Sequence, residues 1–400
     1  MLIVQRVKMT DKGILGHILR KSTYIWLHLD MAFCKTVARV YAAIHAKKPK
    51  KEIKKIAAVW YWPENFNSDE LRLAYWGKYF EKDGYQFDNF KILDVKEFVE
   101  EYEKGTWPQK YLFYRRNYLR RWRQFFKMKD YDVVWIDRAF MPFYPFKSAV
   151  YEPLIKKMGA HLVMDTTDAS DYENNPDLVL STLSQADRIT AAFKKLVEFY
   201  QPKYHNVTRL NWTVPIEGYV VKDNWKLKDP IIIGWMGSPG NFEYLRETLE
   251  QLKEVAKEVP FTFRYICRIK QDIDIPGATI EHHYYGDDYH DIIGTFDIGL
   301  APFTKVSFAT EGKIGMKHQE FMICKIPQVC SPVAISEHAK HEEHVLIAKD
   351  ISDWKGLILR LLSDEDLRTR LGNNSRELFD EHYNYDTWYP TLKEVLTDFD

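Results

Sequence analysis

A short stretch in the last quarter of the chain concentrates residue types that could bind an anionic ligand. Residues 311–331 read EGKIGMKHQEFMICKIPQVCS, in which glycines and lysines precede an apolar helical run. Gly312 and Gly315 allow the backbone to approach a ligand closely. Lys313 and Lys317 bring positive charge to the same turn. Because a helix start has free N–H groups, these residues predict a phosphate site, with the amides after Gly315 cradling a diphosphate.

Glu320 adds a second kind of chemistry to this stretch. It falls one helical turn beyond Lys317, so the two side chains share a face of the helix. A carboxylate in this place is suited to accept hydrogen bonds from sugar hydroxyls, including those of a ribose. The combination predicts a nucleotide-sugar site, and the alternative interpretation is an exposed helical glutamate beside a lysine.

The same stretch resembles the donor-site motif of family-four glycosyltransferases, which are retaining enzymes of the GT-B fold. Glu320 matches the second glutamate of that motif, and the residues up to Pro327 match the short apolar run after it. The first glutamate falls on Gly312, so Glu311 is the nearest carboxylate that could replace it, and Lys325 stands where a glycine is usual. Three further segments carry the resemblance from about residue 54 to the C-terminus: ADRITAAFKKL (186–196), IIIGWMGSPGNFEYL (231–245) and FDIGLAPF (296–303).

The elements that must position these residues alternate between strand and helix. Such alternation predicts parallel, doubly wound sheets, and therefore an α/β protein with two Rossmann-like domains facing a cleft, the GT-B architecture. The predicted strands are 56–62, 90–94, 132–137, 161–165, 187–191 and 206–211 in the first half, and 231–235, 261–268, 278–283, 297–301, 327–330 and 344–348 in the second.

This pattern divides the chain into three parts. Residues 1–55 are expected to form a helical extension. Residues 56–215 are expected to form an acceptor domain and residues 216–380 a nucleotide-sugar donor domain. The resemblance implies that a final helix, at about 381–400, packs back on the acceptor domain.

Further candidates lie where predicted strands end, because ligands bind at the carboxyl edge of open α/β sheets. In the second half these are Gly237 and Ser238, in a turn between strand and helix, and Arg268 after the next strand. In the first half they are Arg138 and Asp168, for acceptor binding or acid–base work. Each is alternatively a turn or helix-cap residue.

Composition limits the partners and the compartment. The formal net charge is zero, so nothing global favours nucleic acid. Four scattered cysteines, no signal-peptide core and no run of membrane-spanning length favour a cytoplasmic protein. The basic and aromatic stretch Tyr111–Lys129 is either a scaffold helix or an interfacial helix on an anionic membrane, at its inner face.

Two groups of residues have spacings that suggest a metal. His338, His341 and His344 lack an evident fourth ligand, and the resemblance places them in an ordinary surface helix. Asp272 and Asp274 form an Asp-x-Asp pair but lie late in the chain, inside the second Rossmann-like half. We therefore predict no metal site and no cofactor beyond the nucleotide diphosphosugar itself.

The resemblance implies transfer of a sugar from a nucleotide diphosphosugar to a hydroxyl of a carbohydrate or lipid-linked acceptor, with retention and without a metal. Lys313, Lys317 and backbone amides would stabilise the leaving group. Relatives suggest a role in surface polysaccharide or glycolipid assembly. A sugar-nucleotide epimerase of the same fold remains an alternative, and the missing first glutamate leaves open a non-catalytic binding module.

Overall fold

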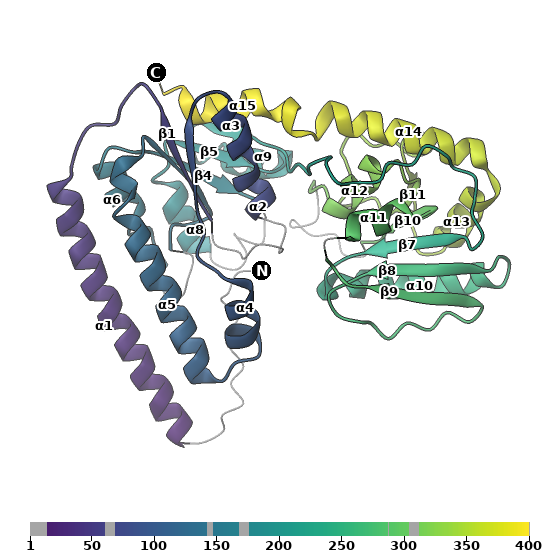
Figure 1. Cartoon of the computed structure of the whole chain (residues 1–400), viewed down its shortest axis with the longest axis horizontal. Coiled ribbons are helices and arrows are strands. Elements are labelled where there is room, and N and C mark those ends of the chain that lie inside the picture. Colours follow the sequence, from purple (N-terminus) through teal and green to yellow (C-terminus); the bar gives the residue numbers. More distant parts are fainter. Residues whose placement is uncertain are drawn as a thin grey trace. The chain divides into compact units, whose positions relative to one another are not determined.

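The computed structural model describes residues 14–60, 69–141, 147–167, 176–286, 288–303 and 312–399. The chain divides into two compact units, one formed by the residues up to Asn211 together with those from Trp388 onward, and the other by Trp212–Thr387. Each unit contains one six-stranded parallel sheet surrounded by helices (Figure 1). The predicted α/β class with two doubly wound sheets is thus confirmed.

The first sheet has the strand order β2-β1-β3-β4-β5-β6. All five residues of β3 (VVWID) are buried, as expected for a central strand covered on both faces. The strands are β1 Lys55–Val59, β2 Gln86–Phe90, β3 Val133–Asp137, β4 His161–Thr166, β5 Arg188–Ala191 and β6 Val207–Arg209.

The strand predicted at 90–94 is wrong, because β2 ends where that prediction begins. Edge strand β2 (QFDNF) is mostly polar and pairs only with β1 in the described sheet. The apolar residues Ile92 and Leu93 instead pack with Phe98 and Phe113 in a separate cluster. The apolar residues at 92 and 93 therefore belong to a small separate core, whereas the strand before them is mostly polar.

The second sheet has the order β12-β11-β10-β7-β8-β9, and its strands agree with the predicted ones to within two residues at each end. One core cluster joins this sheet to α10 (Phe242–Ala256) and α13 (Asp353–Ser363). The strands are β7 Ile232–Met236, β8 Phe261–Ile266, β9 Ala278–His283, β10 Ile298–Ala301, β11 Gln328–Cys330 and β12 Leu346–Ile347.

The remaining helices connect and cover the strands. In the second unit they are α11 Tyr289–Gly294, α12 Met316–Ile323 and α14 Glu365–His382. The first unit contains α1 Ile14–Ile44, α2 Asp69–Arg72, α3 Gly77–Lys82, α4 Val95–Glu97, α5 Trp107–Phe125, α6 Glu152–Lys157, α8 Pro176–Leu183 and α9 Lys194–Tyr200.

The last helix, α15 (Tyr385–Thr397), is fixed to the first unit. Its Leu392 and Leu396 are fully buried. Lys393 forms an ion pair with Asp83, with 2.6 Å between Nζ and Oδ2, and the hydroxyl of Tyr389 donates to the same carboxylate at 2.7 Å. These contacts join the end of the chain to the helical segment that follows β1.

Helix α5 packs within the first unit, as the scaffold alternative predicted. Two of its arginines pair with carboxylates of neighbouring helices: Arg115 with Asp30 of α1, and Arg120 with Glu97 of α4. Phe125 is fully buried. The indole of Trp122 donates to the carbonyl of Cys34 at 3.0 Å, so it faces α1, which lies along α5 (Figure 1). No helix in the described parts of the chain combines the length and apolar character needed to cross a membrane.

Candidate functional site

Helix α12 begins at the carboxyl edge of the second sheet, after β10. Gly315 caps it with extended backbone angles, and its N–H donates to the carbonyl of Ala334 at 2.9 Å. The Gly315 amide is therefore engaged within the protein, and the amides that follow it remain the predicted diphosphate donors. The next amides, of Met316 and Lys317, belong to the first helical turn, where the chain itself offers no helical acceptor. Gly312 has a φ of 81°, which only glycine adopts without strain.

Lys317 is a buried cation on an aromatic platform. Its Nζ lies 4.9 Å from the ring centroid of Trp235 and 5.4 Å from that of Phe303. Among the residues that the structure describes, Nζ has no hydrogen-bond partner. Burial lowers the pKa of Lys317 to about 7, against the opposing effect of the Glu320 carboxylate. A buried polar atom without a partner is costly, and such atoms are typical of ligand sites.

Glu320 is also buried, with 1% of its surface exposed, so the alternative of an exposed helical glutamate is wrong. Its Oε1 accepts hydrogen bonds from the hydroxyls of Tyr219 at 2.8 Å and Tyr289 at 3.3 Å. Its Oε2 has no partner within the described part of the chain. Burial raises the pKa of Glu320 to about 7, although both tyrosines and Lys317 favour its charged form.

The other residues of α12 hold it rigidly in the core of the second unit. His318 shares a hydrogen bond of 2.7 Å with the side chain of Gln328, and burial lowers the pKa of this histidine to about 4. Gln319 donates to the carbonyl of Trp212 at 3.1 Å. Every residue from Lys317 to Ile323 is buried. The charged pair therefore sits on a fixed element.

The turn after β7 shapes the aromatic surroundings of Lys317, and its Gly237 amide is used within the protein. The N–H of Gly237 donates to the carbonyl of Ile266 at 3.0 Å, as expected for the turn that was its alternative interpretation. A Cβ on Gly237 would lie 2.6 Å from the ring of Trp235, so glycine makes room for that ring. Ser238 is exposed at the start of a 3-10 turn, and Arg268 is exposed after β8.

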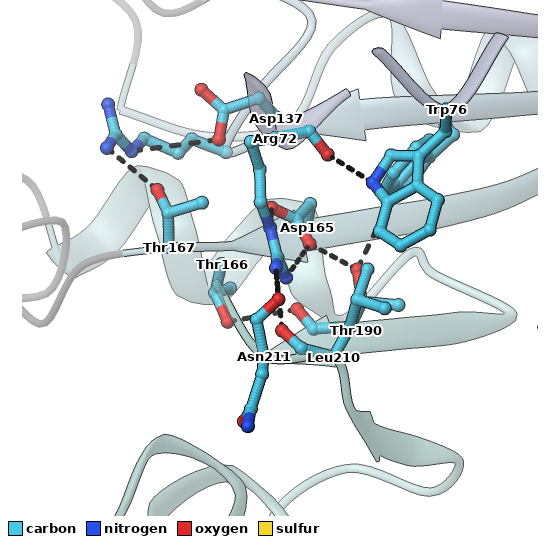
Figure 2. Close-up of polar contacts among 11 residues, drawn as sticks. Arg72, Trp76, Asp137, Asp165, Thr166, Thr167, Thr190, Leu210 and Asn211 are labelled. Carbon is cyan, nitrogen blue, oxygen red and sulfur yellow. Dashed lines mark hydrogen bonds and ion pairs between the residues drawn. The ribbon is translucent and has the colours of Figure 1, made fainter. Parts of the chain in front are cut away.

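At the carboxyl edge of the first sheet, a buried polar network surrounds Asp165. Arg72 pairs with this carboxylate through two bonds of 2.8 and 2.7 Å, and its Nη1 also donates to the carbonyls of Leu210 and Asn211 (Figure 2). Arg138 has a φ of 60° and donates to the hydroxyl of Thr167 at 2.9 Å. Arg138 is thus buried at the predicted edge.

Two predicted residues, Glu311 and Asp168, lie outside the described residues. Sequence reasoning missed Tyr219, Tyr289 and Arg72. The tyrosines had no local signal, because they lie 101 and 31 residues from Glu320 in the sequence. Arg72 had no local signal, because its partner Asp165 is 93 residues away.

The described residues contain no group of three or more histidine, cysteine, aspartate or glutamate side chains arranged to hold a metal. The stretch containing His338, His341 and His344 forms turns, with an isolated bridge between His341 and Val345, which corrects the expected surface helix. His338 stacks on His382 of α14, with ring centroids 4.0 Å apart.

Comparisons with known proteins agree with this architecture. Residues 245–394 match a family model described as glycosyl transferase-like. A comparison with curated proteins gives no significant match. Among solved structures, HepE of Anabaena in complex with UDP-glucose has a TM-score of 0.61 and 10% identity, and the match covers 85% of this chain and 98% of that one.

Two further structures have the same fold. A glycosyltransferase of Rickettsia africae matches with a TM-score of 0.61 and 11% identity, covering 86% of this chain and 97% of that one. An alpha-glucosyltransferase in complex with UDP-glucose and DNA containing an abasic site matches with a TM-score of 0.58 and 13% identity, covering 86% and 99%. These structures show that this chain has the GT-B fold, and the family model adds that residues 245–394 are glycosyl transferase-like.

Proposed function

We propose that this protein transfers a sugar from a nucleotide diphosphosugar to a hydroxyl of a carbohydrate or lipid-linked acceptor. One observation carries the proposal: Lys317 and Glu320 lie one turn apart on a buried helix, and each presents a polar atom without a partner among the described residues. A diphosphate would satisfy the lysine, and the ribose hydroxyls would satisfy Oε2 of the glutamate. UDP-glucose is bound in two of the structures with this fold, which supports a nucleotide-sugar donor.

The proposed chemistry stabilises a departing diphosphate. Negative charge grows on the β-phosphate oxygen as the sugar leaves, and Lys313, Lys317 and the first amides of α12 would neutralise it without a metal ion. We propose that Glu311 takes the role of the first motif glutamate. Transfer with retention is proposed from the resemblance to family-four enzymes.

The first half of the chain would then bind the acceptor. We assign this role to residues 56–215 with the final helix, and we place Arg138 and Asp168 at the acceptor. Residues 216–380, with Gly312, Gly315, Ser238 and Arg268 around Glu320, would bind the donor. Assembly of a surface polysaccharide or glycolipid at the cytoplasmic face of a membrane fits a lipid-linked acceptor.

A non-catalytic binding module is the second candidate, because Gly312 stands where the motif has its first glutamate. Its φ of 81° is unfavourable for any side chain, so a glutamate could not replace it without strain. Such a module would bind the nucleotide sugar and leave it intact. Glu311 must therefore do the work of the missing carboxylate if the chain is a transferase.

A two-stage experiment tests the proposal. Thermal shift against UDP, GDP, ADP and their sugars should identify one nucleotide that stabilises the protein, by about 2.7 kcal/mol at a hundred times its dissociation constant. Release of that nucleotide from its sugar is then measured with and without candidate acceptors. Acceptor-dependent release supports transfer, binding without release supports the module, and sugar isomerisation without acceptor supports an epimerase. No stabilisation by any of these nucleotides would overturn the proposal.

A further inference from the structure

Helix α1 has two apolar faces, and within the described parts of the chain only one of them is buried. The inner face packs against α5 and α6 and contains Leu27, Met31, Cys34, Ala38 and Ala42, all buried. The opposite face exposes large apolar side chains at helical spacing, so that they form one continuous stripe. We call this set the outer stripe; its residues are Trp26, Leu29, Phe33, Val40 and Ile44.

The exposure of the outer stripe is large for such side chains. Trp26 is 62% exposed, Phe33 65% and Ile44 73%. From Trp26 to Ile44 the stripe extends for five helical turns, or about 27 Å. Contiguous apolar patches of this kind on a protein surface mark a place where something docks.

The charges around the outer stripe are positive. Lys21 and Arg39, which are both exposed and share a helix face, lie along one flank of it. The sequence of α1 contains a single acidic residue, Asp30, and this carboxylate is neutralised by Arg115 of α5. The described part of α1 therefore presents apolar and cationic side chains, with no unpaired anion to repel a negative surface.

We propose that the outer stripe is a docking surface for an anionic lipid bilayer, with α1 lying in the plane of the membrane interface. Tryptophan, phenylalanine and leucine flanked by lysine and arginine are the residues that hold a helix at this depth. Apolar side chains enter the boundary between headgroups and acyl chains, and the cationic flank meets anionic headgroups. Lipid fits this face better than a second copy of the chain, because a two-fold contact would bring two cationic flanks together.

This role replaces the one predicted for Tyr111–Lys129. Trp122 of α5 packs on α1, while Trp26 and Phe33 of α1 are exposed, so α5 supports the docking helix. The biological purpose rests on the proposed function, since a lipid-linked acceptor is confined to the membrane. Lipid binding itself does not depend on catalysis and can be tested separately.

The test is co-sedimentation of the full chain with vesicles. Wild type is expected to pellet with vesicles of phosphatidylcholine and phosphatidylglycerol in equal parts, less with pure phosphatidylcholine, and less in high salt. The double variant Trp26→Ser/Phe33→Ser should lower the partition coefficient on the order of tenfold or more. Ile269→Ser/Tyr284→Ser is the matched control, because these second-unit residues are 58% and 63% exposed, and it should pellet like wild type.

Three results would overturn the proposal: no binding of wild type to the mixed vesicles, equal binding by wild type and the α1 double variant, or loss in both double variants. A concentration-dependent dimer in sedimentation velocity that the α1 variant abolishes would assign the stripe to a second copy instead. Unchanged melting temperature and unchanged nucleotide binding in the α1 variant show that its fold and donor site are intact. Failure of vesicle binding thus leaves the proposed function standing, and failure of nucleotide binding leaves the membrane surface standing.

Discussion

At Glu320 the needs of the folded protein and of the ligand site conflict. The carboxylate is buried and its pKa is raised from 4.5 to about 7, so the folded state holds a proton that the unfolded chain releases between these values. Its contribution to stability is therefore largest below pH 4.5 and is lost as the pH rises toward 7. Sugar hydroxyls, however, are best accepted by the charged form. Ligand binding would therefore favour the ionised carboxylate, whereas folding favours the protonated one.

We predict that Glu320→Gln stabilises the unliganded protein at pH 8 and abolishes tight nucleotide binding. The amide oxygen can still accept from Tyr219 and Tyr289, while the cost of the buried charge disappears, on the order of 3 kcal/mol. The affinity for nucleotide should fall tenfold or more, because hydrogen bonds to a charged acceptor contribute about 1.5–3 kcal/mol. Denaturant unfolding at pH 4 and pH 8, with calorimetry, measures both effects. Unchanged nucleotide affinity would falsify the ribose role of Glu320.

Burial has the opposite effect on Lys317: its pKa is lowered from 10.5 to about 7. The cost of its buried charge is fully present below pH 7 and vanishes as the pH rises through 10.5. Lys317→Met should therefore be at least as stable as wild type at pH 6. Its turnover should fall about a hundredfold, as expected when one preplaced donor to a developing anion is removed.

Steady-state nucleotide release is the measurement for Lys317→Met, and Lys340→Met, at an exposed lysine paired with Glu343, is the control. Chelator should have little effect on either enzyme. If turnover disappears with EDTA and returns with manganese while Lys317→Met stays active, a metal ion stabilises the leaving diphosphate instead. Asp272 and Asp274 would then be the first candidates for its ligands.

At the scale of elements, the turn between β7 and α10 sets the position of the lysine platform. Gly237→Ala should destabilise the second unit by about 1–3 kcal/mol, because a Cβ there would lie 2.6 Å from the Trp235 ring. Gly240→Ala is the matched control, since the nearest atom to its Cβ would be 3.9 Å away. Thermal unfolding of both variants, with and without nucleotide, measures the difference. Equal stabilities would show that the ring can move without cost.

In the first unit, the ion pair between Arg72 and Asp165 joins α2 to β4 and to the backbone where the chain leaves the sheet. Asp165→Asn should cost about 3–5 kcal/mol, because it leaves the buried guanidinium without its anion. Glu243→Gln, at an exposed pair with Arg246, should change stability by less than about 1 kcal/mol. Denaturant unfolding compares the two variants. A small loss of stability in Asp165→Asn would mean that the carbonyls of Leu210 and Asn211 are enough to compensate the buried charge of Arg72.

At the scale of the whole molecule, the sequence predicted what depends on local pattern. The second sheet followed from the alternation of predicted strands and helices along the sequence. The same reasoning placed the cationic turn and Glu320 on one helix. It failed where an apolar run served a satellite core, as at Ile92 and Leu93.

Long-range partners could not be predicted in this way. The hydroxyl that Tyr219 donates to Glu320 comes from 101 residues away, and Ala334 takes the amide of Gly315 from a separate loop. Likewise, the pattern of α5 was compatible with a membrane and with a scaffold, and its contact between Trp122 and Cys34 joins residues 88 positions apart. Burial, and with it the pKa values of Lys317 and Glu320, is a property of the assembled unit.

The return of α15 to the first unit has a consequence for the order in which the protein is made. The residues from Trp388 onward complete a unit that began before Trp212, and all of Trp212–Thr387 is translated in between. Since domains form as their residues leave the ribosome, the second unit can close while the first still lacks Leu392 and Leu396. The first unit therefore begins before the second and is completed after it.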